Sequence, residues 1–380
     1  MKADSVVEHL YGLLASLTGK TKKELHSVKI LVIFVKYIIR LLKTDSMVNP
    51  PYYASDNRYD GNMKYERCGK SGLLLPRISL GLWHNFGDIN PMAVSRDMLH
   101  CAFDKGITCF DLANNYGPSY GSAEETFGQI MQKSFRPYRD EMVITTKAGH
   151  DMWPGPYGNW GSRKYLIASL NQSLRRMNLE YVDIFYSHRF DPETPMEETL
   201  QTLVDIVRQG KALYAGISKW PLEAAQFAYD YLAAHDTPCL IYQGRYNMID
   251  RNMETSGILK QAAENGIGFT AFSPLEQGIL TGRYLNGIPE GSRASNGKFL
   301  KPERITPELV EKLKRLDSLA RERQQTLAQM SLAWLLSDRR VTSVIIGSSS
   351  VDQLRDSLGC LENPAFTGEE LKEIDKILLS

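Results

Sequence analysis

The segment Val182–Ser218, with the sequence VDIFYSHRFDPETPMEETLQTLVDIVRQGKALYAGIS, decides the fold. It begins and ends with compact apolar runs, Val182–His188 and Ala212–Ser218, whose continuous apolar character is typical of parallel strands covered on both faces. Between these runs, Pro195–Gln209 repeats leucine and valine at helical spacing, so that one face is apolar. The segment therefore predicts a strand, a helix and a second strand parallel to the first.

The same alternation continues through residues 78–359. Eight apolar runs, each bounded by loop residues, are predicted to be strands: Ile78–Leu82, Cys109–Ala113, Met142–Lys147, Val182–His188, Ala212–Ser218, Cys239–Gln243, Gly268–Ser273 and Ser343–Gly347. Amphipathic stretches of helical period lie between them, including Ser162–Met177, Pro221–Ala234 and Pro307–Arg323. Eight strand–helix repeats predict an α/β fold, a single (β/α)8 TIM barrel with long βα loops and a C-terminal helix. A doubly wound open sheet is the alternative.

An N-terminal β-hairpin is predicted before the barrel. Its strands are Met63–Arg67 and Leu73–Pro76, joined by the turn sequence Cys-Gly-Lys-Ser-Gly. We therefore assign residues 63–380 to the barrel and residues 1–62 to an N-terminal extension that is not part of it.

The extension contains the longest apolar run of the sequence, Val28–Leu42. Its fifteen residues are fewer than the about 20 that a membrane-spanning helix needs, and three basic residues interrupt it. A basic amphipathic helix that lies on a membrane or on a partner is one interpretation. The other is that Met47 is the true start and that residues 1–46 are an upstream extension.

Composition restricts the class of protein. The chain has 380 residues, 43% hydrophobic and 23% charged, which is typical of a globular protein. Its 45 Lys and Arg residues balance 44 Asp and Glu residues, so a net charge of +1 provides no bulk attraction to nucleic acid or to an anionic membrane. The five cysteines form no CxxC pair, which excludes a zinc ribbon and argues against a disulfide scaffold. We therefore expect a cytoplasmic protein.

One short motif needs a separate interpretation. Gly266–Ala271 matches the G-x-G-x-x-A pattern of dinucleotide-binding sites. However, it lies between a predicted helix and a predicted strand, whereas the motif functions in the order strand, turn, helix. We therefore interpret the match as coincidental.

Reactive side chains lie at the ends of three consecutive predicted strands. These are Asp111, Lys147 and His188, and Tyr116 lies in the loop after the first of the three strands. The carboxyl ends of the strands form the reactive face of a (β/α)8 barrel. Each residue alone is more often structural than catalytic, but a lysine at the end of a buried strand needs a counter-charge, and Asp111 is one strand away. We therefore expect the four side chains to form one site.

These residue types together suit the reduction of a carbonyl group. A nearby ammonium stabilises a phenolate and is expected to lower the tyrosine pKa from its reference value of about 10. The tyrosine can then give a proton to a carbonyl oxygen while the carbonyl carbon gains a hydride. A neutral histidine donates a second hydrogen bond to the same oxygen. The hydride itself requires a carrier.

Three motifs resemble those of the aldo-keto reductase superfamily. They are Phe110–Gly117 (FDLANNYG), Thr145–Gly149 (TTKAG) and Tyr186–Arg189 (YSHR). The resemblance extends from about Met63 to the C-terminus. It implies a TIM barrel that binds NADP(H) without a Rossmann domain. The catalytic residues that it implies are Asp111, Tyr116, Lys147 and His188.

The resemblance also implies a set of cofactor-binding residues along the carboxyl ends of the strands. They are Trp83, Asp111, Ser218, Lys219 and Gln243 near the nicotinamide, Ser273, Pro274, Leu275, Gln277, Gly278, Arg283 and Arg293 along the phosphates, and Gly347, Ser349 and Gln353 near the adenosine.

Two departures from the family pattern concern the cofactor. Other branches carry Lys and Arg where this chain has Gly347 and Gln353, and Asp356-Ser357 stand where Glu-Asn is usual. NADPH is the first choice because arginines favour a phosphate dianion. NADH stays open as the alternative.

Two further stretches indicate a particular group within this superfamily. Leu80–Gly87 and Gly149–Gly158, with Tyr165 and Gly287-Ile-Pro, resemble the L-glyceraldehyde 3-phosphate reductase group, which is related to voltage-gated potassium channel β subunits. This resemblance implies that the chain reduces small aldehydes, of the glyceraldehyde 3-phosphate and methylglyoxal class, and that it forms a homo-oligomer.

Four residues are expected to contact the substrate: Trp83, His84, Trp153 and Arg189. Arg189, or the helix start at Ser162-Arg163, suits a substrate phosphate, because arginine and helix N-termini both bind anions. A surface ion pair is the alternative interpretation for these arginines.

Two other classes of protein remain as alternatives. A metal-dependent barrel hydrolase would use His84, His150 and His188, but the first strand lacks HxH and no matching strand end offers a carboxylate, so we expect no metal. An NADP(H)-binding, redox-sensing module like the channel β subunits would show little turnover. His188 argues against this module, because the channel subunits resembled here carry Asn at that position.

Overall fold

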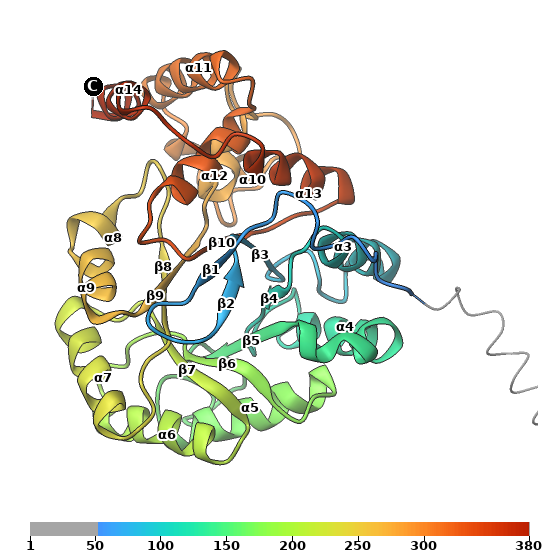
Figure 1. Cartoon of the computed structure of the whole chain (residues 1–380), viewed down its shortest axis with the longest axis vertical. Helices are drawn as coiled ribbons and strands as arrows, with labels where there is room; N and C mark the ends of the chain where they lie inside the picture. Colours follow the sequence, from blue (N-terminus) through green and yellow to red (C-terminus); the bar gives the residue numbers. More distant parts are fainter. Residues whose placement is uncertain (1–51, 380) are drawn as a thin grey trace, which may run out of the picture. The chain divides into compact units, whose positions relative to one another are not determined.

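The computed structural model describes residues 52–379; the apolar run Val28–Leu42 and the candidate start Met47 lie outside the described residues. Eight parallel strands close into a barrel in the order β10-β3-β4-β5-β6-β7-β8-β9 (Figure 1). The strands are β3 (Ile78–Gly81), β4 (Cys109–Asp111), β5 (Val143–Ala148), β6 (Val182–Ser187), β7 (Ala212–Ser218), β8 (Ile241–Arg245), β9 (Gly268–Phe272) and β10 (Ser343–Ile346). The predicted (β/α)8 barrel is confirmed, and the open sheet is excluded.

All eight predicted runs coincide with barrel strands, and the largest shift in position is at β8. The sequence predicted Cys239–Gln243, whereas the strand is Ile241–Arg245. The reason is the pairing register, because Ile241 is the residue that lies opposite both Gly216 of β7 and Gly268 of β9. Arg245 is thereby included in the strand and brought to the reactive end of the barrel.

Helices surround the barrel and cover its strands (Figure 1). The α-helices are α3 (Met92–Asp104), α4 (Ser122–Ile130), α5 (Arg163–Met177), α6 (Met196–Arg208), α7 (Leu222–Ala234), α8 (Asn252–Thr255), α9 (Ile258–Asn265), α10 (Arg293–Asn296), α11 (Pro307–Glu322), α12 (Leu327–Ser337), α13 (Val351–Leu358) and the C-terminal α14 (Gly368–Leu379). A π-helical turn, η1 (Met131–Phe135), and the 3-10 turns η2 (Arg136–Glu141), η3 (Glu276–Thr281), η4 (Pro302–Arg304) and η5 (Gly359–Leu361) complete the connections.

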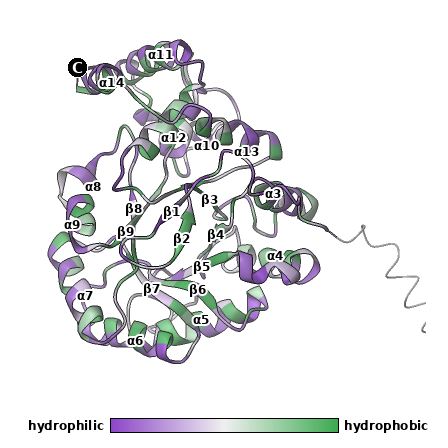
Figure 2. Cartoon of the chain, in the orientation of Figure 1, coloured by the Kyte–Doolittle hydropathy of each residue, from purple (hydrophilic) through white to green (hydrophobic). Residues whose placement is uncertain are grey.

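The helix faces follow the hydrophobic periodicity of the sequence. In α6, Leu200, Leu203, Val204 and Ile206 are buried, while acidic residues occupy its first turn. Figure 2 shows hydrophobic residues concentrated on the strands and on the inner sides of the helices. Burying these stripes against the barrel supplies the main stabilisation of each strand–helix unit.

The N-terminal hairpin closes one end of the barrel. Its strands are β1 (Tyr65–Arg67) and β2 (Leu74–Pro76), and the Lys70 amide donates to the Gly266 carbonyl oxygen over 2.9 Å. Gly266 ends α9 and precedes β9, so the G-x-G-x-x-A match has the helix-to-strand order expected from the sequence. With this end covered, the reactive groups gather at the opposite, carboxyl ends of the strands.

Residues 52–62 contact the barrel. The Tyr52 hydroxyl donates to Asp104 over 2.7 Å, and Arg58 pairs with Glu141 at 2.6 Å. Residues 52–62, which the sequence assigned to the extension, thus make side-chain contacts with residues 63–380. They contain no helix or strand that would produce a periodic pattern in the sequence.

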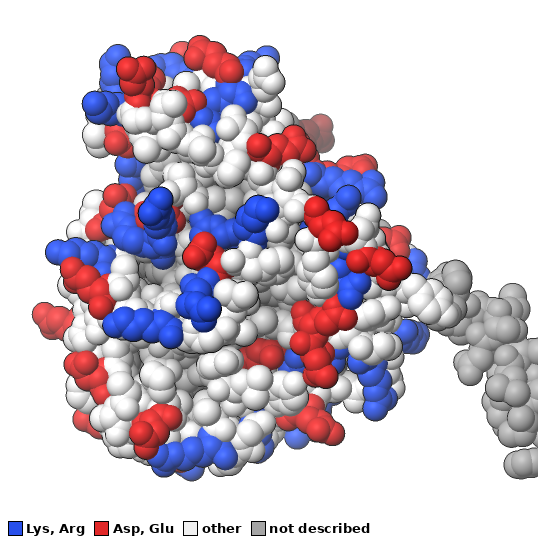
Figure 3. Space-filling view, in the orientation of Figure 1, with Lys and Arg blue, Asp and Glu red and all other residues white. Residues whose placement is uncertain are grey.

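Opposite charges are interspersed on the molecular surface. On the face seen in Figure 3, acidic and basic side chains are both spread over the surface, with several basic side chains left of the centre. No helix within residues 52–379 is long and apolar enough to cross a membrane.

The contact between α4 and α5 provides a test of barrel packing. A Cβ added at Gly128 would lie 2.1 Å from the Arg176 carbonyl oxygen. This oxygen belongs to the backbone of α5, so relieving the clash requires a shift of the helix. We expect Gly128→Ala to lower the free energy of unfolding by about 1–3 kcal/mol. Gly72→Ala is the control, because a Cβ at Gly72 meets nothing within 4 Å. Urea denaturation curves in which both variants matched the wild type would contradict the close approach.

Candidate active site

A buried ion pair lies at the centre of the reactive end. Asp111 ends β4 and Lys147 lies near the end of β5, and their Oδ2 and Nζ atoms are 2.7 Å apart. The Lys147 side chain is fully buried and Asp111 nearly so. The parallel register that pairs Asp111 with Thr145 brings the two side chains to the same level of the barrel. The counter-charge that the sequence required for Lys147 is therefore Asp111, as expected.

The ion pair is completed by further hydrogen bonds. Lys147 Nζ also donates to the Leu112 carbonyl oxygen over 2.7 Å. Asp111 Oδ1 accepts from Thr145 Oγ1 at 2.8 Å and from Gln243 Nε2 at 2.9 Å. Burial lowers the Lys147 pKa, whereas the Asp111 charge raises it and limits this shift. Satisfied partners of this kind are what make a buried charge pair tolerable.

Tyr116 lies beside this pair, in the loop after β4. Lys147 Nζ is 4.9 Å from the centre of its ring. Burial, and secondly the Asp111 charge, raise the Tyr116 pKa well above its usual value of 10.0. The predicted lowering of this pKa is therefore wrong for the structure as it stands. The physical reason is first the burial of the phenol, which disfavours the charged phenolate, and secondly the negative charge of Asp111.

His188 follows β6 and completes the group of four. Its ring centre is 6.1 Å from that of Tyr116 and 4.4 Å from that of His150. Burial lowers the His188 pKa well below 6.5, and the neighbouring charges of Lys147 and Lys219 lower it further. The ring is therefore neutral at physiological pH. Its buried Nδ1 has no hydrogen-bond partner among the described residues.

A cavity of about 1180 Å³ opens above these residues. The predicted site residues that line it are Trp83, Asp111, Tyr116, His188, Lys219, Ser273, Pro274, Leu275, Gln277, Gly278, Arg283, Arg293, Gly347, Ser349 and Gln353. The predicted residues that do not line it are Lys147, Ser218, Gln243, His84, Trp153 and Arg189. Lys147 and Gln243 lie directly behind a residue that lines the cavity, since both hydrogen-bond to Asp111.

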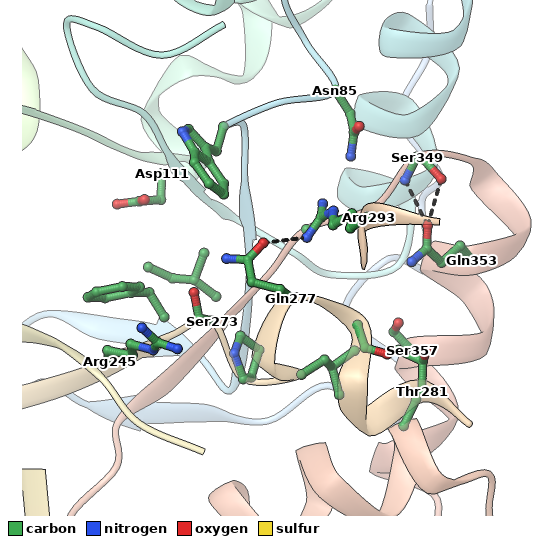
Figure 4. A pocket seen from close by; sticks show the side chains of 18 of the residues that line it. Asn85, Asp111, Arg245, Ser273, Gln277, Thr281, Arg293, Ser349, Gln353 and Ser357 are labelled. Atoms are coloured by element: carbon green, nitrogen blue, oxygen red, sulfur yellow. Dashed lines mark hydrogen bonds between the residues drawn. The ribbon is translucent and has the colours of Figure 1, made fainter. Parts of the chain in front are cut away.

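Polar side chains from two loops meet at one end of the cavity. Figure 4 shows Gln277 and Arg293 pointing toward each other, with Ser349 and Gln353 on the neighbouring segment. Arg293 Nη1 donates to Gln277 Oε1 over 2.8 Å. The Ser349 amide and hydroxyl both donate to Gln353 Oε1, at 2.9 and 2.8 Å. The loops after β9 and β10 thus form a preformed polar wall.

The loop after β9 has an unusual backbone. The non-glycine residues Ser273, Glu276 and Gln277 all have positive φ values, between 45° and 57°, a region that L-residues rarely adopt. The buried Glu276 carboxylate ion-pairs with Arg245 and accepts from Asn247 Nδ2 over 2.8 Å. These contacts fasten the strained loop to the end of β8.

The residues present fit a nicotinamide dinucleotide. Ser218 Oγ is buried without a partner among the described residues, and Ser218 lies opposite Gln243 in the sheet. An orphaned hydroxyl of this kind suits a carboxamide. Lys219, Arg283 and Arg293 along the cavity provide cations for phosphates.

The predicted substrate residues are dispersed. Trp83 lines the cavity, and the His84 ring packs at a tilt against Trp83 and Phe299, with ring centres 3.8 and 4.3 Å away. Trp153 packs on Tyr165, 5.2 Å between ring centres, away from the cavity lining. The aromatic side chains of Trp83, His84 and Trp153 were predicted to line the substrate pocket. Only Trp83 does so, because the direction in which each side chain packs decides whether it faces the cavity.

The two predicted phosphate-binding arginines have other partners. Arg163 ion-pairs with Asp205, and its backbone amide donates to Glu198 over 2.9 Å. Arg189 Nε donates to the Gly149 carbonyl oxygen over 2.7 Å. Arg163 therefore forms a surface ion pair, which was the alternative to the interpretation that it binds the substrate's phosphate.

Several cavity-lining residues were not predicted. They are Asn85, Asn115, Tyr120, Asp151, Arg245, Phe272, Thr281, Tyr284 and Thr326, among others; Asp356 and Ser357, which the sequence showed as a departure from the family's cofactor pattern, also line the cavity. Arg245 could have been found, because it lies two residues beyond Gln243, and alternate residues of a strand share one face. Phe272 directly precedes the predicted Ser273 and lies 5.4 Å from Lys219 Nζ.

The described residues do not assemble a metal site. No group of three or more His, Cys, Asp or Glu side chains within residues 52–379 could hold an ion. His84 stacks with aromatic rings, apart from the pair formed by His150 and His188.

A buried Asp–Lys pair, a tyrosine and a neutral histidine at the carboxyl end of a (β/α)8 barrel define a reductase class, and the chain belongs to the aldo/keto reductase family, whose model matches residues 77–379. It is therefore an oxidoreductase. Over 329 residues, 86% of this chain and 95% of the relative, it is 53% identical to an "L-glyceraldehyde 3-phosphate reductase" of Escherichia coli O157:H7.

Two further relatives support this placement. The "L-glyceraldehyde 3-phosphate reductase" of Escherichia coli (strain K12) is also 53% identical over the same shares of both chains. A "Probable voltage-gated potassium channel subunit beta" of Arabidopsis thaliana is 34% identical over 326 residues, 84% of this chain and 97% of the relative. Both groups that the sequence resembled are therefore relatives, and the reductases are the more similar.

The ion pair predicts a stability change. Asp111→Asn leaves the Lys147 ammonium buried without its counter-charge, so we expect the free energy of unfolding to fall by about 3 kcal/mol. Asp60→Asn, at an exposed aspartate, is the control and should change it by less than about 0.5 kcal/mol. Denaturant unfolding at pH 7 measures both. Equal stability of the two variants would show that the pair contributes nothing.

Proposed function

We propose that the chain reduces small aldehydes, of the L-glyceraldehyde 3-phosphate and methylglyoxal class, to alcohols with NADPH. The observation that carries this proposal is Tyr116 beside the buried Asp111–Lys147 pair, with neutral His188 at the same cavity. The similarity to proteins named L-glyceraldehyde 3-phosphate reductase supports the substrate class.

Tyr116 is the proposed general acid. Bound NADPH supplies the hydride to the carbonyl carbon. Tyr116 gives its phenolic proton to the carbonyl oxygen, and its raised pKa keeps that proton in place until a substrate arrives. Lys147, 4.9 Å from the ring centre, provides the positive charge that accompanies the phenolate left behind. His188, held neutral, donates a hydrogen bond to the same oxygen.

NADPH is the proposed cofactor on the chemistry of the cavity. By the family resemblance, Ser218 and Gln243 would hold the carboxamide from just behind the residues that line the cavity, and Lys219, Arg283 and Arg293, which line it, would hold the phosphates. At the proposed adenosine end, Ser349 occupies the Gln353 oxygen, which leaves the Gln353 amide nitrogen to donate to a phosphate. Donors and cations on one wall favour the additional phosphate of NADPH over the hydroxyl of NADH.

Location and assembly belong to the same proposal. All five cysteines are unpaired thiols, which suits the reducing cytoplasm. Homo-oligomeric assembly rests on the family resemblance alone.

A second candidate function is a redox-sensing module that binds NADP(H) with little turnover. The similarity to a probable channel β subunit favours it. His188 argues against it, because a module without turnover has no need of a neutral donor beside the proposed acid. Turnover measurements separate the two functions.

The decisive experiment removes the Tyr116 hydroxyl. We expect Tyr116→Phe to lower kcat by about 10²–10⁴-fold while NADPH binding, measured by fluorescence titration, is retained. The assay follows NADPH and NADH oxidation with L-glyceraldehyde 3-phosphate and with methylglyoxal. Tyr53→Phe, at a largely exposed tyrosine, is the matched control and should equal the wild type. Tight NADPH binding by the wild type without turnover would favour the sensing module.

The two pKa shifts predict the pH dependence of the reaction. Tyr116 donates its proton below its pKa, which lies above 10.0, and His188 is neutral above its pKa, which lies below 6.5. Both are in their working form between these values. We therefore expect neither Tyr116 nor His188 to cause a change in kcat at saturating NADPH between about pH 6.5 and 10. A kcat profile with an apparent pKa near 7 would contradict the assignment of either group.

A further inference from the structure

The Arg189 side chain is engaged by the loop between β5 and α5, residues 149–161, called here the 149–161 loop. Its Nε donates to the Gly149 carbonyl oxygen and its Nη2 to Asn159 Oδ1, both over 2.7 Å. Its guanidinium carbon lies 3.6 Å from the centre of the Trp160 ring, in a stacked contact. One side chain thus joins the beginning and the end of the loop.

The loop is fastened internally around the same residues. The Met152 amide donates to the Gly158 carbonyl oxygen over 2.9 Å, and the Asn159 side chain donates to Asp151. Trp160 has a φ of 71°, which a bulky residue rarely adopts, and its amide donates to Asn159 Oδ1 over 2.7 Å. Asn159 therefore accepts from Arg189 and from Trp160 with one oxygen. Removing Arg189 would loosen the junction that holds this strained residue.

The first residues of the loop form part of the cavity wall. His150 and Asp151 line the cavity, whereas Arg189 does not. The His150 ring centre is 4.4 Å from that of His188, and its Nε2 is 3.3 Å from Lys219 Nζ. The position of the loop therefore determines the surface that a molecule beside His188 meets.

We propose that Arg189 is a positioning residue that holds the 149–161 loop against the cavity and does not bind the substrate's phosphate. The inference rests on the proposed function in taking a small aldehyde as the substrate. Within the part of the chain that the structure describes, the guanidinium donates its hydrogen bonds to the loop and stacks on a ring of the loop, and its planar fork matches two oxygens and one aromatic face together. A lysine cannot reproduce this set, because its ammonium is a point charge on a flexible stem.

The test compares Arg189→Ala and Arg189→Lys with the wild type. For both variants we expect faster hydrogen–deuterium exchange of the amides in the 149–161 loop. We expect KM to rise about tenfold for L-glyceraldehyde 3-phosphate and equally for L-glyceraldehyde, with a smaller change in kcat, because Tyr116, Asp111 and Lys147 lie on other elements. NADPH affinity and the melting temperature should stay those of the wild type, as in the control Arg321→Ala at an exposed arginine.

The opposite pattern would overturn the proposal. A KM increase confined to the phosphorylated substrate, relieved in Arg189→Lys and without faster exchange in the loop, would make Arg189 a phosphate ligand. Unchanged exchange with unchanged KM would show that the loop does not depend on Arg189. If the wild type reduces neither aldehyde, the proposed function fails, whereas the exchange measurement still decides whether Arg189 holds the loop.

Discussion

The ion pair between Asp111 and Lys147 is the interaction on which the site depends. It joins neighbouring strands, both of its side chains are buried, and each partner alone would be costly to bury. Thr145, Gln243 and the Leu112 carbonyl oxygen complete its hydrogen bonds. The pair therefore keeps a full ammonium next to Tyr116 without leaving an uncompensated charge in the core.

This pair also sets the electrostatic character of its surroundings. Burial, and secondly the Asp111 charge, raises the Tyr116 pKa so that the resting phenol keeps its proton, and burial also lowers the His188 pKa so that its ring stays uncharged. The two groups that face a carbonyl oxygen can consequently both be hydrogen-bond donors. Low polarity around them strengthens each such bond relative to water.

The fold was predictable because its signal is repetitive. Apolar runs and amphipathic stretches recur eight times, and local patterns of this kind determine which segments are strands. The approach of Asp111 to Lys147 was also predictable, since an unpaired buried lysine is too costly. The direction of the Tyr116 pKa shift was not predictable, because it depends first on how deeply the packing of the loop after β4 buries the phenol, and secondly on the nearby Asp111 charge. Likewise, Arg189 follows a strand end directly, yet its direction is decided by Trp160 and Asn159, thirty residues earlier in the chain.

The strained loop after β9 has a consequence for the energetics of association. Ser273, Glu276 and Gln277 hold rare backbone conformations, and the ion pair of Glu276 with Arg245 fastens them from within the chain itself. The conformational entropy of ordering this loop is therefore lost when the chain folds rather than when a ligand arrives. A ligand that binds to a loop already ordered does not lose binding free energy by ordering it. The cost appears instead as a lower free energy of unfolding of the protein.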